Sequence, residues 1–216
     1  MAETDLAIYA ERDLRAEAEE LIRTYRWQIR RYAERVRGFY DSFRPLPMRR
    51  PVPPIVREMS LAARRFGVGP MAAVAGAIAE RVGRDLLRLV PEVIVENGGD
   101  IFLKTRAPCV LAVYAGKRSP LKGRLRFRLP KGAWGVCTSS GTVGHSVSFG
   151  KADAVVAVAR SAALADAAAT AIGNVVKSPD DVARVLDAEK RRKRLDGLVI
   201  VIGRAVGLWG RIELVD

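Results

Sequence analysis

The sequence predicts a single α+β domain in which N-terminal helices pack on a mainly antiparallel sheet. In the first third of the chain, apolar residues recur at three- and four-residue steps, which is typical of amphipathic helices. Beyond Pro91 the step falls to two, which is typical of half-buried strands. Helices gathered first and strands later favour an α+β fold. Because 216 residues suit one hydrophobic core, we expect one domain over residues 1–216.

The N-terminal part divides into a short edge strand at residues 4–9 and three helices. A long amphipathic helix is predicted over 11–43, and two shorter helices are predicted over 55–66 and 71–89. The intervening segment 44–54 contains five prolines. Each proline removes a backbone donor and restricts the residue before it, so this segment is expected to be a connector.

The second part of the chain is expected to form the sheet. Strands are predicted at residues 92–96, 101–105, 110–115, 121–129, 135–138, 152–159, 198–202 and 208–214. Ser161 can cap a helix that runs to Ile172, and another helix follows Pro179. Cys109 and Cys137 lie far apart within predicted strands, so we expect buried, unpaired thiols rather than a disulfide or a zinc site.

The net charge of +13 is the one unusual bulk property. Its basic residues are spread over several elements, and no zinc finger, basic zipper or RNP-like strand accompanies them, so nucleic-acid binding is not expected as the main function. The run at residues 190–194 is interpreted as a solvated helix end. No apolar stretch is long enough to span a bilayer, and the N-terminus lacks the layout of a signal peptide. We therefore expect a cytoplasmic protein without a membrane partner.

The first candidate site segment is the turn Asn97-Gly98-Gly99-Asp100 between two apolar strands. Asn-Gly readily adopts positive φ, so the turn can simply close a hairpin. Alternatively, the glycines let backbone N–H groups approach a ligand while Asp100 presents a carboxylate. The residues alone leave both interpretations open.

The second candidate is the stretch from Cys137 to Gly150, which is rich in hydroxyls and glycines and holds the only histidine of the chain, His145. It could bind a flavin or nucleotide through backbone donors and hydroxyls, while His145 exchanges protons near neutral pH. The alternative is a hydroxyl-rich turn with a surface histidine. The stretch is neither a P-loop nor a serine-hydrolase elbow. Its candidate binding residues are Thr138, Ser139, Ser140, Gly141, Thr142 and Gly144.

The third candidate is the pair Asp166 and Thr170, which share one face of a predicted helix. A carboxylate and a hydroxyl suit a hard cation such as Mg²⁺, although a polar stripe on a packed helix would give the same pattern. A fourth segment, residues 69–76, carries small residues that permit either close helix packing or ligand approach; packing is the expected role.

In this order, the four segments resemble the ApbE superfamily, which includes the FAD:protein FMN transferases. The run Gly98-Gly99-Asp100-Ile101 is similar to its Gly-Gly-Asp-Ile segment, and Thr138-Ser139 with Gly141 is similar to its Thr-Ser-Gly loop. His145 corresponds to the histidine that follows this loop, and Asp166 with Thr170 to the metal-binding helix. Longer strings that begin at residues 68, 95 and 138 are most similar to an uncharacterised branch of the superfamily.

The resemblance implies a site for FAD or FMN with Mg²⁺, and an acceptor protein as partner. It also implies that His145 or Asp100 acts as the base. The sequence departs from the transferases in two places: His145 is followed by Ser146-Val147-Ser148-Phe149 instead of Ile-Ile-Asp-Pro, and the predicted helix 71–89 contains no lysine. Two hypotheses follow. One is a Mg-dependent flavin transferase or FAD pyrophosphate-cleaving enzyme, and the other is a non-catalytic flavin- or nucleotide-binding protein.

Overall fold

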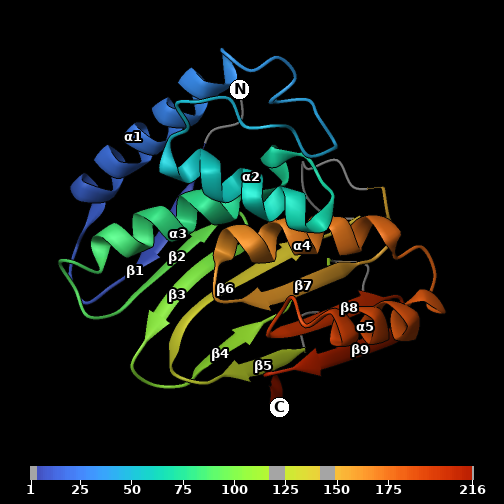
Figure 1. The fold of residues 1–216 in the computed structure, drawn as a ribbon. Coiled ribbons are helices and arrows are strands. Elements are labelled where there is room, and N and C mark those ends of the chain that lie inside the picture. Colours follow the sequence, from blue (N-terminus) through green and yellow to red (C-terminus); the bar gives the residue numbers. More distant parts are fainter. Residues whose placement is uncertain (1–3, 117–124, 142–148, 216) are drawn as a thin grey trace.

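A computed structural model of the chain describes residues 4–116, 125–141 and 149–215. The fold is α+β, as predicted, and it has three layers: helices, a seven-stranded antiparallel sheet, and a small three-stranded sheet on the opposite side (Figure 1). The helices are α1 (Arg15–Ala33), α2 (Pro54–Phe66), η1 (Pro70–Ala73), α3 (Val74–Leu86), α4 (Ala162–Val175) and α5 (Asp181–Arg192).

The large sheet has the strand order β1-β2-β3-β6-β7-β8-β9, and every neighbouring pair is antiparallel. Its strands are β1 (Leu6–Tyr9), β2 (Val93–Asn97), β3 (Asp100–Thr105), β6 (Gly132–Ser139), β7 (Ala154–Ala159), β8 (Gly197–Ile202) and β9 (Ala205–Gly210). The small sheet, in the order β10-β5-β4, contains β4 (Cys109–Ala112), β5 (Arg126–Leu129) and β10 (Glu213–Val215).

The central strands are apolar along their whole length because both faces of the large sheet are covered. All six residues of β7 are buried, and so are all six of β8. On one face, Phe102 and Cys137 join the core beneath the helices, and on the other Leu103 and Trp134 pack with Phe127 of the small sheet. A strand that is buried on both sides loses the apolar and polar alternation of a surface strand.

The predicted helix over 11–43 is too long, since α1 ends at Ala33. The chain continues in turns, and Gly38 adopts a φ of +79° that interrupts any helix. Val36 and Phe39 remain buried nonetheless, at 5% and 2% exposure. Their apolar spacing therefore reflects packing of a turn against the core, which periodicity alone does not distinguish from a helix.

Other boundaries of helices and strands also differ from the prediction. The predicted helix 71–89 begins as the 3₁₀ turn η1 and ends at Leu86. The predicted strand 208–214 is split between β9 and β10, which belong to different sheets, because Gly210 has a φ of +103° between them. The predicted strand 121–129 is described only from residue 125, and β5 begins at Arg126.

The two cysteines differ in burial. Cys137 is fully buried, as expected, whereas Cys109 is only half-buried because β4 lies at the edge of the small sheet. Neither cysteine forms a disulfide. None of the helices in the described part of the chain is long and apolar enough to cross a bilayer.

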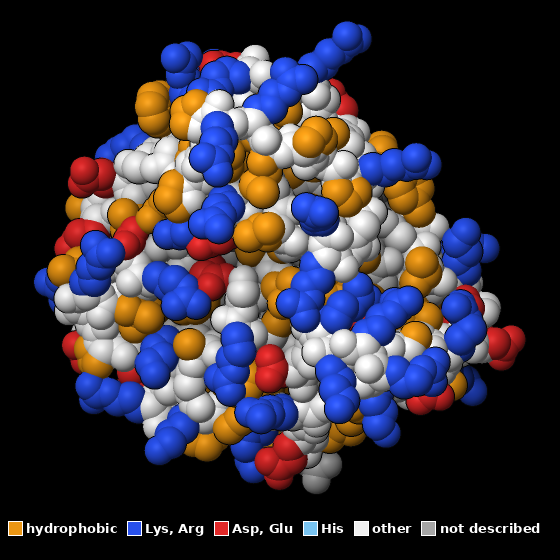
Figure 2. All heavy atoms as spheres, viewed as in Figure 1, with side chains coloured by type: hydrophobic (Ala, Val, Ile, Leu, Met, Phe, Trp, Pro, Cys, Tyr) orange, Lys and Arg blue, Asp and Glu red, His pale blue; other side chains and the backbone are white. Residues whose placement is uncertain are grey.

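The basic residues are spread across the face shown in Figure 2, with acidic side chains between them. In the run 190–194, the first four residues are exposed, as expected for a solvated helix end. Arg194 differs from this expectation. It pairs with the buried Glu189 at 2.6 Å, donates to the Arg65 carbonyl at 2.7 Å and lies 4.1 Å from the Phe66 ring centroid. Arg194 therefore ties the end of α5 to α2.

A buried carboxylate also joins two helices. Glu80 of α3 is 6% exposed and accepts hydrogen bonds from the Ser161 hydroxyl at 2.8 Å and from the Ala162 N–H at 2.6 Å. Arg84, one turn further along α3, pairs with the other oxygen of Glu80 at 2.7 Å. As predicted, Ser161 caps α4 by accepting the Leu164 N–H at 3.3 Å. Glu80 thus adds a second cap, supplied by a neighbouring helix.

We expect Glu80→Ala to lower the free energy of unfolding by about 2–4 kcal/mol, since it leaves buried donors at the start of α4 unsatisfied. Urea denaturation monitored by circular dichroism measures this. The matched control is Glu20→Ala, at an exposed position of α1, which should change stability by less than about 0.5 kcal/mol. Similar small losses in both variants would contradict a structural role for Glu80.

Candidate functional site

The hairpin between β2 and β3 supplies the first part of the site. Gly98 and Gly99 have φ values of +63° and +99°, and a Cβ on either would meet no atom within 4 Å. The glycines are thus required by the backbone of a two-residue turn, as the hairpin interpretation predicted. Asn97 and Asp100 flank this turn and form the last pair of the β2–β3 ladder. The turn therefore holds their two side chains close together at one end of the sheet.

The side chains on either side of the turn reach two other elements. The Asn97 amide donates to the Ala75 carbonyl in the first turn of α3 at 3.1 Å. Asp100 accepts the Thr138 N–H, near the end of β6, at 3.3 Å. The hairpin is thereby attached both to the start of a helix and to the strand that leads into the loop of the second candidate segment.

Asp166 lies in the second turn of α4 and is 8% exposed. Its Oδ2 accepts the Gly76 N–H of α3 at 2.9 Å. A Cβ on Gly76 would lie 2.3 Å from the Ala162 carbonyl oxygen, so α3 and α4 touch at this point through backbone (Figure 1). The small residues of segment 69–76 thus serve helix packing, as expected, and Gly76 additionally offers its N–H to Asp166.

The two carboxylates, Asp100 and Asp166, lie close enough for their charges to interact in a poorly solvated environment. Burial raises the pKa of Asp100 to about 7, although hydrogen bonds from Cys137 and the Thr138 N–H act in the opposite direction. Burial, and secondly the charge of Asp100, raise the pKa of Asp166 well above its usual range, while N–H donors of Gly76 and Ala75 partly oppose this rise. The pair therefore favours a shared proton or an added cation near neutral pH.

The thiol of Cys137 lies beside this pair. It is fully buried, its Sγ is 3.2 Å from the Ala162 carbonyl oxygen, and it also bonds to Asp100. Burial first, then the charges of both carboxylates, raise its pKa well above the usual range, so it stays a neutral thiol and a donor. Sequence patterns did not predict this contact, because strand periodicity places Cys137 in the core without identifying its neighbour.

The remaining predicted residues lie along α4 and β6 or outside the described residues. Thr170 is half-buried, one turn beyond Asp166 on α4. Ser139 and Ser140 are half-buried, and a Cβ on Gly173 would be 3.2 Å from the Ser139 Oγ. Gly141 donates its N–H to the Ala152 carbonyl at 2.9 Å. Thr142, Gly144 and His145 lie outside the described residues.

The structure thus brings Asn97, Asp100, Thr138 and Asp166 to one place, with Thr170 and Ser139 on the adjoining parts of their elements. No group of three or more His, Cys, Asp or Glu side chains suited to a metal occurs among residues 4–116, 125–141 and 149–215. This donor set still fits Mg²⁺, which proteins commonly hold through one or two carboxylates together with the phosphates of a substrate.

The raised pKa of Asp100 makes stability depend on pH. Between its ordinary value and about 7, the folded protein retains a proton that the unfolded chain has released, so the free energy of unfolding falls as pH rises. Asp166 acts in the same direction. We expect Asp100→Asn to reduce the fall between pH 4 and 7 by up to about 4 kcal/mol. Urea titrations across this range measure it, with exposed Asp187→Asn as control. Equal slopes in the parent and Asp100→Asn proteins would contradict the assignment.

Comparison with known proteins agrees with this architecture. The family described as AbpE bacteria matches residues 1–199. A UPF0280 protein of Methanocaldococcus jannaschii is 44% identical over 206 residues, covering 92% of this chain and 83% of the relative. One of Methanopyrus kandleri is 41% identical over 215 residues, covering 97% and 88%.

Two solved structures share the fold. The ApbE protein of Thermotoga maritima aligns with a TM-score of 0.52 at 17% identity, over 94% of this chain and 83% of its own. A mutant flavin transferase ApbE of Vibrio cholerae gives a TM-score of 0.52 at 14% identity, over 97% and 98%. At such low identity these matches establish the fold alone. From the family match and the UPF0280 relatives we conclude that the chain belongs to the AbpE bacteria family, within an ApbE-like, uncharacterised branch.

Proposed function

We propose that this protein is a Mg-dependent enzyme that cleaves the pyrophosphate of FAD and transfers FMN to a hydroxyl acceptor. The observation that carries the proposal is the pair of half-buried Asp100 and buried Asp166, whose raised pKa values suit proton transfer and cation binding. The solved flavin transferase ApbE of the same fold supports a flavin as the substrate class. The acceptor is a protein threonine, or water in a simple hydrolysis.

Asp100 is the described group best suited to act as the base. A carboxylate with a pKa of about 7 is partly ionised at neutral pH and can accept a proton from an attacking hydroxyl. Its hydrogen bond from the Thr138 N–H fixes its direction. His145, the other candidate base, follows Thr138 in the same loop region of the sequence.

The reaction balances as a phosphoryl transfer. The acceptor oxygen forms a bond to the phosphorus on the FMN side, the pyrophosphate P–O bond breaks, and AMP leaves with the bridging oxygen. The acceptor proton passes to Asp100 or His145. Hydroxyls of Thr138, Ser139, Ser140 and Thr142 bind the ligand, together with Gly144 and the turn Asn97-Gly98-Gly99. The N–H groups of Thr138 and Gly141 are not available, because they already bond to Asp100 and to the Ala152 carbonyl. Mg²⁺ held by Asp166 and Thr170 would neutralise charge that develops on the leaving phosphate.

A passive flavin- or nucleotide-binding protein is the second candidate. It is favoured by the sequence that follows His145, Ser146-Val147-Ser148-Phe149, and by the lack of lysine in residues 71–89. Both differ from the transferase pattern. The two candidates share a ligand class and differ in whether AMP is released.

Asp166→Asn separates the metal role from the packing role of this residue. The amide oxygen can still accept the Gly76 N–H, so α3 and α4 remain joined, but the charge that a divalent cation needs is lost. We expect the Mg²⁺-dependent affinity for FAD, measured by isothermal titration, to fall by about 10-fold or more. AMP release, measured by mass spectrometry, should fall with it.

The control for this variant is Asp187→Asn, an exposed change on α5. It should bind FAD and release AMP like the parent protein. If the parent releases no AMP and binds FAD equally well in the presence of a chelator, the enzyme is excluded and the passive binding protein is the better account.

His145→Gln tests the proton acceptor. Glutamine keeps a polar side chain but cannot accept the proton, so FAD affinity should persist while AMP release slows by about 10². The same pair of assays applied to Asp100→Asn shows which residue is the base. An unchanged rate in His145→Gln together with a large loss in Asp100→Asn assigns the role to Asp100.

A further inference from the structure

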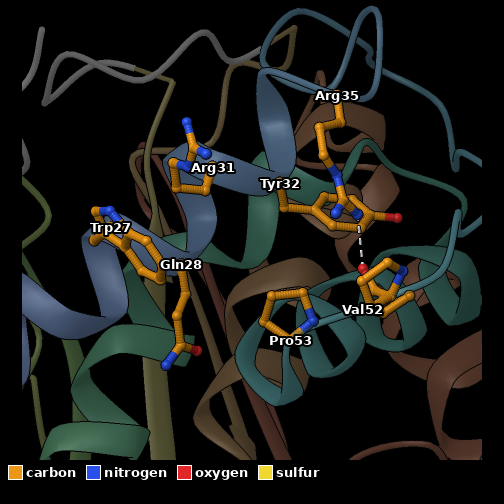
Figure 3. Close-up of a pocket in the computed structure, with 8 residues that line it drawn as sticks. Trp27, Gln28, Arg31, Tyr32, Arg35, Val52 and Pro53 are labelled. Atoms are coloured by element: carbon orange, nitrogen blue, oxygen red, sulfur yellow. Dashed lines mark hydrogen bonds between the residues drawn. The ribbon is translucent and has the colours of Figure 1, made fainter.

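A cavity lies away from the candidate site, between the C-terminal half of α1 and the chain that enters α2. Its volume is about 410 Å³. Trp27, Gln28, Arg31 and Tyr32 line it from α1, and Pro51 and Pro53 line it from the proline-rich connector (Figure 3). This is within the usual size of small-ligand pockets. None of its lining residues belongs to the site formed by Asp100 and Asp166.

The wall formed by Tyr32 is held in place by the connector. The Arg35 guanidinium lies over the Tyr32 ring, 5.6 Å from its centroid, and donates to the Pro51 carbonyl at 2.8 Å (Figure 3). The Tyr32 hydroxyl accepts the Arg49 N–H at 2.9 Å. These contacts, and the fixed φ of the prolines, keep this side of the cavity in one shape. A ligand therefore meets a largely pre-formed wall.

The opposite side offers an aromatic surface. Trp27 is 62% exposed, although burial of an indole ring is energetically favourable. Arg31 follows one turn later on the same face of α1. Such an exposed ring gives a planar ligand a stacking surface, and a guanidinium one turn away lies within reach of an attached anion.

The charge around the cavity favours an anion. Residues 26–57 contain nine arginines and only two acidic residues, Glu34 and Asp41. Arg31 pairs with Glu34 at 3.2 Å, but both side chains are well exposed, at 64% and 43%. Exposed pairs of this kind are weak, so a phosphate can replace Glu34 as the partner of Arg31.

Gln28 adds a group suited to a base edge. Its Oε1 is buried and has no hydrogen-bond partner among the described residues. An unsatisfied buried acceptor is unfavourable. A side chain that rotates toward the cavity could pair this oxygen with a donor of a ligand, and its amide nitrogen with an acceptor beside that donor. Adjacent donors and acceptors of this kind occur on the edges of nucleobases.

We propose that this cavity is a binding site for a nucleoside monophosphate. The base stacks on Trp27 and bonds to the Gln28 amide, and the phosphate pairs with Arg31. The inference rests on α1 and the connector, and does not depend on the proposed flavin chemistry. The cavity volume of about 410 Å³ is that of a small-molecule pocket, which favours a free nucleotide over a polynucleotide.

The test is isothermal titration of the full chain with AMP, GMP, CMP and UMP. Adenosine and ribose 5-phosphate serve as probes that lack the phosphate or the base. We expect at least one nucleotide to bind at least 10-fold more tightly than either fragment. Trp27→Ala and Arg31→Ala should each weaken that binding by about 10-fold or more. Arg23→Ala, at an exposed position of the same helix, is the control and should leave it unchanged.

Asp166→Asn should leave the binding of GMP, CMP and UMP unchanged, which distinguishes the cavity from the candidate active site, where AMP is the proposed leaving group. Circular dichroism confirms that each variant is folded. Gln28→Leu adds a variant that removes hydrogen bonding but keeps the packing, and it should alter the preference among the four bases. Absence of binding by all four nucleotides at millimolar concentration would overturn the proposal. So would equal binding of ribose 5-phosphate, or an equal loss in Arg23→Ala, because either result indicates unspecific attraction of anions.

Discussion

At the crossing of α3 and α4, each helix supplies a buried carboxylate to the N-terminus of the other. Glu80 of α3 accepts N–H bonds at the start of α4, and Asp166 of α4 accepts the N–H of Gly76 at the start of α3. The first N–H groups of a helix have no partner within the helix, and they carry partial positive charge. The exchange therefore satisfies both helix ends at once. It also fixes the angle and the register of the crossing, and with them the position of Asp166.

This exchange is possible only because the backbones approach closely. Ala162, the first residue of α4, lies between Gly76 of α3 and Gly135 of β6. A Cβ on Gly76 would be 2.3 Å from the Ala162 carbonyl oxygen, and a Cβ on Gly135 would be 2.3 Å from the Ala162 Cα. Any larger residue would push α4 away from the sheet. The same contacts bring Asp166 toward Asp100, so helix packing and site geometry have a common cause.

Sequence patterns predicted the helices, strands and turns well where one local property determines them, such as apolar alternation or the conformational freedom of glycine. Alternation located the strand at Phe127, because the residues of β5 are alternately exposed and buried, and the Asn97–Asp100 turn followed from the preferences of glycine. The prediction was wrong where buried residues do not belong to a regular element: Val36 and Phe39 have helical spacing but lie in turns. Contacts between distant segments, such as those of Glu80, were also missed, because they leave no local pattern in the sequence. The candidate site was located through the order of its motifs, which the resemblance supplied. The partners of Asp166 needed coordinates, because α3 and α4 are joined only by the fold.

The neighbouring charges distinguish Glu80, a carboxylate with a structural role, from Asp166, a carboxylate suited to chemistry. Glu80 is countered by Arg84, so its buried charge is neutralised. Among the described residues, neither Asp100 nor Asp166 forms an ion pair with Lys or Arg. Instead, burial raises the pKa of both, the charge of Asp100 raises the pKa of Asp166 further, and a neutral thiol lies beside them. One carboxylate, that of Asp166, is enough to cap α3. When it is ionised, it can accept more hydrogen bonds than the one from the Gly76 N–H. A second carboxylate next to the cap is unfavourable for folding alone. A proton or a cation between the two removes that cost, which is the property that a metal-assisted transfer site requires.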